Sequence, residues 1–248
     1  MSKLRVIGNY VSPYVRKVLV CLEIKGLDYE IDPIVPFLGN DRFAEVSPLR
    51  RVPVLFDGDV VLSDSSVICQ YLEDKVPSPR LYPADIAQRA RARWIEEYAD
   101  TRMADILIWR IFNEVALKPA IWGEKGDREK VARTVEKEVP EIFGYLEQQS
   151  PEQGFMFGAL SIADIAVMAF IRNYQFCRFT VDPAKWPKLA ALVERVCATP
   201  AMQKLMTYEH ALVRTPPAQQ FEVLRQMGAP VATETFGSNT PRRGVMPI

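Results

Sequence analysis

The chain has 248 residues, 48% of them hydrophobic, which is typical of a globular protein with one or two domains. Its 31 basic residues balance its 31 acidic residues, so the composition gives no general electrostatic attraction to nucleic acid or to anionic membranes. The longest apolar run, Ile165 to Ile171, is far shorter than the ~18 residues that a membrane span needs.

The first part of the chain alternates predicted strands and helices. Lys3 to Gly8 predicts a strand that ends at glycine, and Tyr29 to Val35 predicts a second strand, which Pro33 places at a sheet edge. Between them Ser12 is a predicted N-cap, followed by apolar residues with the spacing of a helix. A short irregular helix is expected over Asn40 to Val46.

Residues 51–66 predict a hairpin followed by a helix start. Val52 to Phe56 predicts one strand and Val60 to Leu62 the returning strand. Because Pro53 cannot donate to a sheet, it lies at an edge or follows a cis bond, and in either case the Val52 backbone N–H and C=O can face an extended, peptide-like ligand. Asp64 and Ser65 then offer an N-cap whose N–H groups and hydroxyl can hold a carboxylate.

An ordinary hairpin with an ordinary cap is the alternative interpretation of these residues. The order of elements nevertheless favours a specific fold, because strand, helix, strand, helix, two strands and a helix, with a proline opening the third strand, predict a thioredoxin-like sandwich.

A proline-rich stretch, Val76 to Pro83, marks the predicted domain boundary. We expect a first domain over residues 1–76, a linker over 77–84, an all-helical domain over 85–213 and a C-terminal extension over 214–248. The predicted helices are Asp85–Leu117, Asp127–Gln149 with a kink at Pro140, Trp186–Ala198 and Ala201–Leu212.

Two further segments carry specific expectations. Ser161 to Asp164 forms a capping box before a helix that is apolar all round, so Asp164 is interpreted as structural and the helix as buried. In the proline-rich extension, Ala218 to Met227 is amphipathic, and we expect the extension to pack back on the body.

Cysteine and histidine usage excludes several classes of protein. The four cysteines form no Cys-x-x-Cys pair, and the start of the chain has no signal-peptide architecture, so we expect a cytoplasmic protein with reduced thiols and without a metal. The single histidine, His210, is interpreted as a surface or helix-end residue, which leaves no basis for a histidine triad or a multi-histidine site.

Five motifs in order connect these observations to a known family. They are Ser12-Pro13-Tyr14-Val15-Arg16, Ser47 to Leu55, Asp64 to Ile68, Arg80-Leu81-Tyr82-Pro83, and Gly158 with Ser161 to Asp164. With them the chain resembles the cytosolic glutathione S-transferase superfamily, of the serine type, over Leu4 to Tyr208.

The resemblance implies an α+β chain with an N-terminal thioredoxin-like domain and an all-α helical C-terminal domain. It also implies a cytoplasmic homodimer that uses glutathione as cosubstrate in detoxification, with no metal, nucleic acid or membrane as partner. For the dimer we expect Arg89, Arg91 and Arg93 to face Glu73 and Asp74 of the other chain.

The family's glutathione contacts carry over to five positions. Val52 would bind the cysteinyl backbone, with Pro53 cis, and Arg51 would reach the glycine carboxylate. Asp64 and Ser65 would bind the γ-glutamyl end. Asp64 stands where glutamate is commoner, and its shorter side chain puts the contact with the γ-glutamyl amine in doubt.

Thiol activation is expected from a hydroxyl rather than from a base. Ser12 matches the serine of the serine-type classes, and Tyr10 is the alternative donor. Ser12 as a plain N-cap also stays open. The absence of cysteine from positions 9–14 disfavours the cysteine-type members that form mixed disulfides with glutathione.

The expected activity is that of a glutathione transferase that adds the glutathione thiolate to an electrophilic small molecule. Peroxide reduction, dehalogenation, ether cleavage and isomerisation are alternatives on the same thiolate, and a non-catalytic binding or regulatory module is the rival class. The acceptor wall is expected on the first long helix, at Met103, Ile106, Leu107 and Arg110.

Overall fold

The structure is a computed structural model that describes residues 3–244, and these form two compact units. Unit 1 takes the described residues up to Pro79 together with those from Lys204 onward, and unit 2 is Arg80–Gln203. The break near residue 80 falls inside the predicted linker, whereas the C-terminal extension forms part of unit 1 instead of a separate segment.

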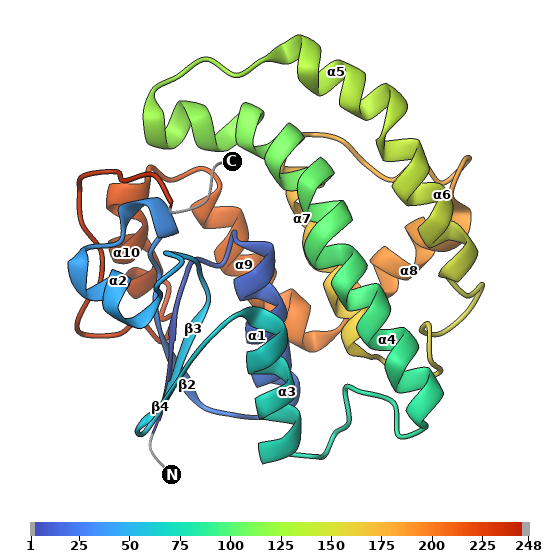
Figure 1. Cartoon of the computed structure of the whole chain (residues 1–248), viewed down its shortest axis with the longest axis horizontal. Helices are drawn as coiled ribbons and strands as arrows, with labels where there is room; N and C mark the ends of the chain where they lie inside the picture. Colours follow the sequence, from blue (N-terminus) through green and yellow to red (C-terminus); the bar gives the residue numbers. More distant parts are fainter. Residues whose placement is uncertain (1–2, 245–248) are drawn as a thin grey trace. The chain divides into compact units, whose positions relative to one another are not determined.

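Unit 1 contains a four-stranded mixed sheet with the order β2-β1-β3-β4 (Figure 1). Its strands are β1 (Leu4–Ile7), β2 (Tyr29–Asp32), β3 (Val54–Asp57) and β4 (Val60–Ser63). β1 pairs with β2 in parallel and with β3 antiparallel, and β4 returns antiparallel to β3. This arrangement confirms the predicted thioredoxin-like fold.

The helices of unit 1 include α1 (Pro13–Ile24), α2 (Asp41–Val46) and α3 (Ser65–Lys75), with a short turn of 3-10 helix, η1 (Pro36–Leu38). The predicted apolar stripe of α1 is buried: Val15, Val18, Leu19 and Leu22. α1 packs against α3, where the thiols of Cys21 and Cys69 lie 3.5 Å apart. Cys21 is therefore a core residue.

The second predicted strand is shorter than expected. It was predicted to run to Val35, but β2 ends at Asp32, directly before Pro33. β2 is one of the two edge strands of the sheet, and its outer edge is covered by the C-terminal extension. An isolated bridge joins Ile31 to Val231, and the Ile31 N–H donates to the Pro230 carbonyl at 2.8 Å.

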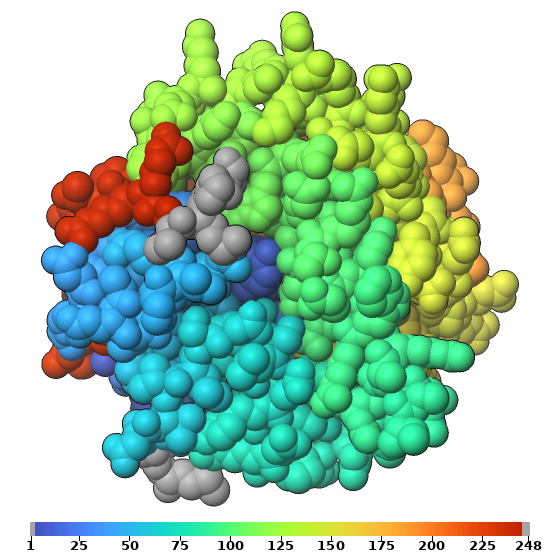
Figure 2. All heavy atoms as spheres, in the orientation of Figure 1, coloured from blue at the N-terminus to red at the C-terminus, as the bar shows by residue number. Residues whose placement is uncertain are grey.

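The C-terminal extension is thus an integral part of unit 1. After α10 (Pro217–Gln226) the chain runs along β2 and α2, and Figure 2 shows its atoms (red) lying against those of the first fifty residues (blue). The buried carboxylate of Asp32 accepts from the Phe236 N–H at 2.6 Å and from the Thr235 hydroxyl at 2.8 Å. The expectation that the extension packs on the body is met at these contacts.

Unit 2 consists of helices: α4 (Ile86–Tyr98), η2 (Ala99–Trp122), α5 (Arg128–Lys137), α6 (Val139–Gln149), α7 (Ile162–Phe176) and α8 (Pro187–Cys197). α4 continues directly into η2, which is wound as a π-helix, so the first long helix ends five residues later than predicted. The second predicted helix is two helices, because the chain bends at Glu138, two residues before Pro140. α9 (Pro200–Leu212) begins in unit 2 and ends in unit 1.

The centre of unit 2 is α7, and its N-terminus confirms the predicted capping box. Asp164 accepts from the Ser161 N–H at 2.9 Å and from the Ser161 hydroxyl at 2.7 Å. It also accepts from the Met156 N–H at 2.9 Å, and burial raises its pKa. Residues 162–174 are all buried, so Asp164 is structural, as the sequence indicated.

Candidate functional site

The strand register brings three loops of unit 1 to one end of the sheet. Ile7 lies opposite Val54, and Val54 lies opposite Ser63. The residues that follow β1, precede β3 and follow β4 must therefore start from one row of the sheet. These are the loop to Ser12, the Val52-Pro53 pair and the Asp64-Ser65 cap.

A glycine shows how closely two of these loops approach each other. Gly8 has a φ of +146°, and a Cβ at this position would lie 2.4 Å from Cγ2 of Val15 and 3.2 Å from Cβ of Val52. A side chain larger than hydrogen would separate the start of α1 from the segment before β3.

Ser12 caps α1 at this end of the sheet. Its Oγ accepts from the Val15 N–H at a long 3.5 Å, and its side chain is half-buried. Because the oxygen is the acceptor in this contact, the hydroxyl proton remains available to a ligand. The helix N-terminus adds positive potential at the same point.

The loop that carries Ser12 is held by a residue of the C-terminal extension. The Asn9 side chain donates to the Pro33 carbonyl at 3.1 Å and to Gln220 Oε1 at 2.7 Å, and it accepts from the Val11 N–H at 3.0 Å. Sequence reasoning missed Asn9 and Gln220, because no motif relates a glutamine in a proline-rich extension to a loop more than 200 residues away.

A buried ion pair holds the same loop from another direction. The guanidinium of Arg16 pairs with the carboxylate of Glu209 on α9, and both side chains are fully buried. Arg16 also donates to the Val11 carbonyl at 3.3 Å. Removing one partner of such a buried pair leaves an uncompensated charge, so both residues are required together.

The segment before β3 has backbone groups that are available for hydrogen bonds to a ligand. Within residues 3–244 no hydrogen bond uses the backbone N–H or C=O of Val52, and the Val52–Pro53 peptide bond is cis. The preceding turn is closed by the buried Ser47 hydroxyl, which accepts from the Arg51 N–H at 2.9 Å and donates to the Arg51 carbonyl at 2.8 Å.

The start of α3 offers donors and one carboxylate oxygen. Oδ1 of Asp64 caps the helix by accepting from the N–H groups of Ser66 at 2.9 Å and Val67 at 3.1 Å. The second oxygen of Asp64 and the hydroxyl of the buried Ser65 have no partner among the described residues. A ligand with a carboxylate beside an ammonium group fits this combination.

A buried lysine stands behind this helix start. The Lys17 ammonium donates to the Ser66 hydroxyl at 2.9 Å, and Lys17 is fully buried. Its charge adds to the positive potential at the start of α3. Sequence reasoning did not single out Lys17, because it lies between apolar stripe positions on α1, where a lysine is usually solvated.

The alternative donor, Tyr10, lies in the interior of unit 1. Its side chain is 1% exposed and packs against Tyr208, with ring centroids 5.0 Å apart. Its hydroxyl has no hydrogen-bond partner among the described residues, and burial raises its pKa. A ligand would have to enter this interior to reach the phenol, whereas Ser12 is half-buried.

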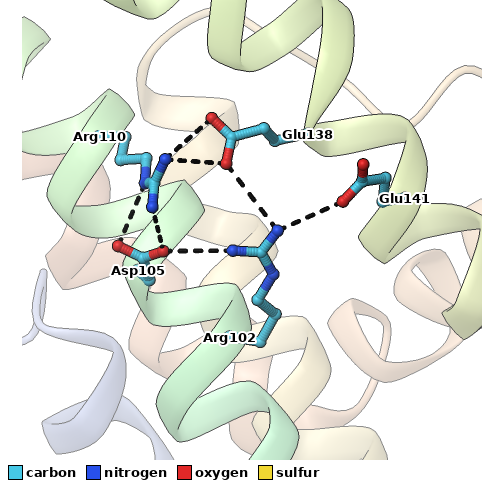
Figure 3. Close-up of polar contacts among 5 residues, drawn as sticks. All are labelled: Arg102, Asp105, Arg110, Glu138 and Glu141. Atoms are coloured by element: carbon cyan, nitrogen blue, oxygen red, sulfur yellow. Dashed lines mark hydrogen bonds and ion pairs between the residues drawn. The ribbon is translucent and has the colours of Figure 1, made fainter.

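The four residues expected in the acceptor wall all lie on η2, and they differ in environment. Met103, Ile106 and Leu107 are buried in full. Arg110 is held in ion pairs with Asp105 at 2.8 Å and Glu138 at 2.9 Å, as Figure 3 shows. Their role toward an acceptor stays a prediction.

The remaining expectations concern metals, membranes and histidine. Among the described residues no group of three or more histidine, cysteine, aspartate or glutamate side chains is placed to hold a metal ion. No helix of the described part is long and apolar enough to cross a membrane. His210 is exposed near the end of α9, as predicted.

Comparison with known proteins extends over both units. A family model described as the N-terminal domain of glutathione S-transferase matches residues 6–80, and one described as the C-terminal domain of glutathione S-transferase matches residues 116–208. Together the two matches account for more than half of the chain. The first includes all three loops of the candidate site.

Curated relatives match over different lengths. The zeta-class glutathione S-transferase of Euphorbia esula is 28% identical over 210 residues, 82% of this chain and 90% of that protein. Glutathione S-transferase Z2 of Arabidopsis thaliana is 40% identical over 92 residues, 36% of this chain and 41% of that protein. Maleylacetoacetate isomerase of Rattus norvegicus is 27% identical over 196 residues, 75% and 84% of the respective chains.

Solved structures match as well. A glutathione S-transferase from Rhodospirillum rubrum F11 has 26% identity and a TM-score of 0.75, covering 82% of this chain and 92% of that one. A glutathione S-transferase from Methylobacterium radiotolerans, in complex with glutathione sulfonate, has 25% identity and a TM-score of 0.68, covering 82% and 94%.

Proposed function

The chain belongs to the glutathione S-transferase family, and from this premise we propose that it binds reduced glutathione at the end of the unit 1 sheet and transfers the thiol to an electrophile. The observation that supports the proposal is the strand register, in which Ile7, Val54 and Ser63 lie side by side on neighbouring strands. Three groups suited to glutathione start from this row: a hydroxyl at a helix start, a free main chain and a capped helix N-terminus.

Each part of glutathione has a matching group in this arrangement. The free N–H and C=O of Val52 pair with the cysteinyl backbone, as an added strand would. Ser65 and the start of α3 hold the γ-glutamyl carboxylate, and the free oxygen of Asp64 accepts from the γ-glutamyl ammonium. Arg51 reaches for the glycine carboxylate. The glutathione sulfonate complex of the Methylobacterium protein supports this assignment by analogy.

Ser12 activates the thiol by stabilising the thiolate. A thiol with a pKa of about 8.5 is only about 3% ionised at pH 7. A hydrogen bond to a charged group contributes about 1.5–3 kcal/mol, which lowers a pKa by about one to two units. The thiolate then attacks the electrophilic carbon, the C–S bond forms, and the leaving group departs with the bonding electrons.

Isomerisation is the second candidate, and the relative named maleylacetoacetate isomerase supports it. In this reaction the thiolate adds to a carbon–carbon double bond conjugated to a carbonyl, and the resulting enolate rotates about the new single bond. Expulsion of the thiolate restores the double bond in the other geometry. Transfer consumes glutathione whereas isomerisation regenerates it, so the glutathione balance during turnover separates the two.

Retention on immobilised glutathione tests the binding step directly. We expect the protein to bind such a column and to elute with free glutathione. A panel of electrophiles, peroxides and unsaturated carbonyl compounds then tests catalysis. Retention without turnover of any compound would favour the rival class, a non-catalytic module. A protein that passes through the column would refute the glutathione site.

We also propose a homodimer that works in the cytoplasm. Exposed apolar residues support an interface, with Val60, Val61 and Val67 on β4 and α3, and Trp94, 55% exposed, on α4. The charge pairing expected between chains has less support, because Glu73 pairs with Lys25 of the same chain and Arg89 donates to carbonyls of its own linker. The four free cysteines are consistent with a reducing compartment.

A further inference from the structure

Unit 2 contains a hollow of about 410 Å³ between η2 and α5. It is lined by Arg110, Lys130, Arg133, Thr134, Lys137 and Glu138. The volume lies in the range of pockets that bind small molecules. Four of the six lining residues are cations, and none of the six belongs to the proposed glutathione site.

One face of α5 supplies most of this lining. Lys130, Arg133, Thr134 and Lys137 are spaced by three, one and three residues, which places them on the same face of the helix. Cations three and four residues apart repel each other and weaken a helix unless an anion lies between them. Thr134 is 2% exposed and adds a hydroxyl to this face.

Two of the four cations are already neutralised. Arg110 is fixed between Asp105 of η2 and Glu138, which contacts it with both carboxylate oxygens, at 2.9 and 3.0 Å (Figure 3). Lys130 pairs with the buried Glu114 at 2.9 Å. These pairs hold η2 and α5 together and fix the walls of the hollow.

The other two cations have no such partner. Among the described residues no carboxylate lies within ion-pair distance of Arg133 or Lys137, although both side chains border the hollow. Within residues 3–244, Arg133 and Lys137 are thus the two lining cations without a carboxylate partner, and both lie on α5. A guanidinium and an ammonium one helical turn apart match one doubly charged anionic group.

We propose that this hollow binds a small phosphorylated compound through its phosphate group. A phosphate monoester carries a charge of about −1.5 to −2 at pH 7, which equals the excess of Arg133 and Lys137. The guanidinium of Arg133 offers paired donors for two phosphate oxygens, Lys137 contributes a third contact, and the Thr134 hydroxyl is a neutral donor on the same face. Arg110, expected in the acceptor wall, forms a wall of this site.

Titration calorimetry with inorganic pyrophosphate, which carries the same phosphoryl groups, tests the proposal on the full chain. We expect saturable binding of one pyrophosphate per chain, weaker at high salt. The R133Q/K137Q double variant should bind at least tenfold more weakly. The matched control is K125Q/R128Q, which removes the same charge from exposed positions at and just before the start of α5 and should change the affinity less than twofold.

A second variant should change the pyrophosphate affinity in the opposite direction. Glu138→Gln removes the carboxylate of the lining, so pyrophosphate affinity should rise severalfold. Arg133 and Lys137 are exposed, so their variants should fold, and the single Lys137→Gln variant repeats the test with a smaller change.

Three results would overturn the site. They are no saturable binding at millimolar pyrophosphate, an equal loss in both double variants, and displacement of pyrophosphate by glutathione one for one. Ser65→Ala should leave pyrophosphate binding unchanged, so failure of the glutathione site and failure of this site are distinguishable.

Discussion

Ser12 and Ser65 are both hydroxyl-bearing residues at helix starts, yet they face different parts of the proposed ligand. Ser12 precedes α1 and retains a proton to donate, whereas Ser65 opens α3 with a hydroxyl that has no partner among the described residues. The first can stabilise a thiolate and the second a carboxylate. Substituting each in turn separates activation from binding.

Ser12→Ala should leave glutathione affinity nearly intact and raise the pKa of the bound thiol by about one to two units, because one donor to the thiolate is lost. Turnover near neutral pH should fall about tenfold or more and recover in part toward pH 9. Titration of the thiolate absorbance of bound glutathione measures the pKa. An unshifted pKa would move the role to Tyr10 or to backbone N–H groups.

Ser65→Ala should behave in the reverse way. Glutathione affinity should fall by about one order of magnitude, because a charge-assisted hydrogen bond to the carboxylate is lost. The pKa of the bound thiol should stay within experimental error of the wild-type value. Calorimetric affinity and thiolate titration on the same sample give both numbers, and a shifted pKa with unchanged affinity would contradict the assignment.

The residues of the candidate site fall into two groups: some belong to short sequence motifs, and others act through contacts with residues distant in the sequence. The local structure at Ser12, Val52 and Asp64 could be predicted, because each belongs to a short motif that caps a helix or opens a strand, whereas their role toward glutathione stays a prediction. Asn9, Lys17 and Gln220 could not, because their roles depend on which segments meet in space. A hydrogen bond between residues 9 and 220 leaves no trace in either local sequence.

Among the elements, the extension after α10 has the largest consequence for stability. Residues 230–242 form main-chain hydrogen bonds with Ile31, Phe37, Leu38 and Asn40, two of them with Ile31. They cover the outer edge of β2, and an uncovered edge strand invites pairing with another chain.

Ending the chain after Gly228 should therefore lower the Tm by roughly 10–20 °C, since about five hydrogen bonds of about 1 kcal/mol each are lost. It should also produce concentration-dependent association, visible in light scattering. Of these five main-chain bonds, ending the chain after Thr240 removes only the one from Arg242, together with the exposed ion pair of Arg242 with Asp41, and this chain serves as the control. Equal Tm values for all three chains would show that the extension adds no stability.

The contact of Asp32 with the extension should depend on pH. Burial raises the pKa of Asp32 above its ordinary value, although the Phe236 N–H and the Thr235 hydroxyl oppose this shift. Its contribution to stability is then fully present below the pKa of the unfolded chain and is lost as pH rises through the folded pKa. Asp32→Asn lacks this loss, so its Tm relative to wild type should increase between pH 4 and pH 7. A difference that is constant or decreases would contradict this.

Some helix bounds can be predicted from the hydrophobic periodicity of the sequence and its end signals, and others cannot. Helices α8, α9 and α10 could be predicted to within a residue or two, because a proline marks the start of each. The break between α5 and α6 could not be placed at Glu138, since Pro140 fits the first turn of a new helix as well as a kink. The extension has no periodicity, and its path is determined by contacts with β2 and with residues 37–41, which the local sequence does not reveal.

On the scale of the whole molecule, the proposed dimer depends on exposed apolar side chains. Val67→Asp on α3, 49% exposed in the single chain, should convert the dimer to a monomer, because a buried unpaired carboxylate opposes association. Equilibrium sedimentation at micromolar concentration measures the mass. The control is Val213→Asp, a similarly exposed valine outside β4 and α3. A wild-type protein that sediments only as a 28.2 kDa species would refute the dimer.

Unit 1 is assembled from both ends of the chain, and this has a consequence for biosynthesis. Domains usually fold in order as the nascent chain leaves the ribosome, N-terminal first. Here β2, Asp32 and Asn9 emerge early, but Glu209, Gln220 and residues 230–242 are translated only after unit 2. The loop that carries Ser12 is therefore fully supported only after these later residues have been synthesised. A ribosome that stops within unit 2 leaves a chain with every glutathione motif and an unsupported site.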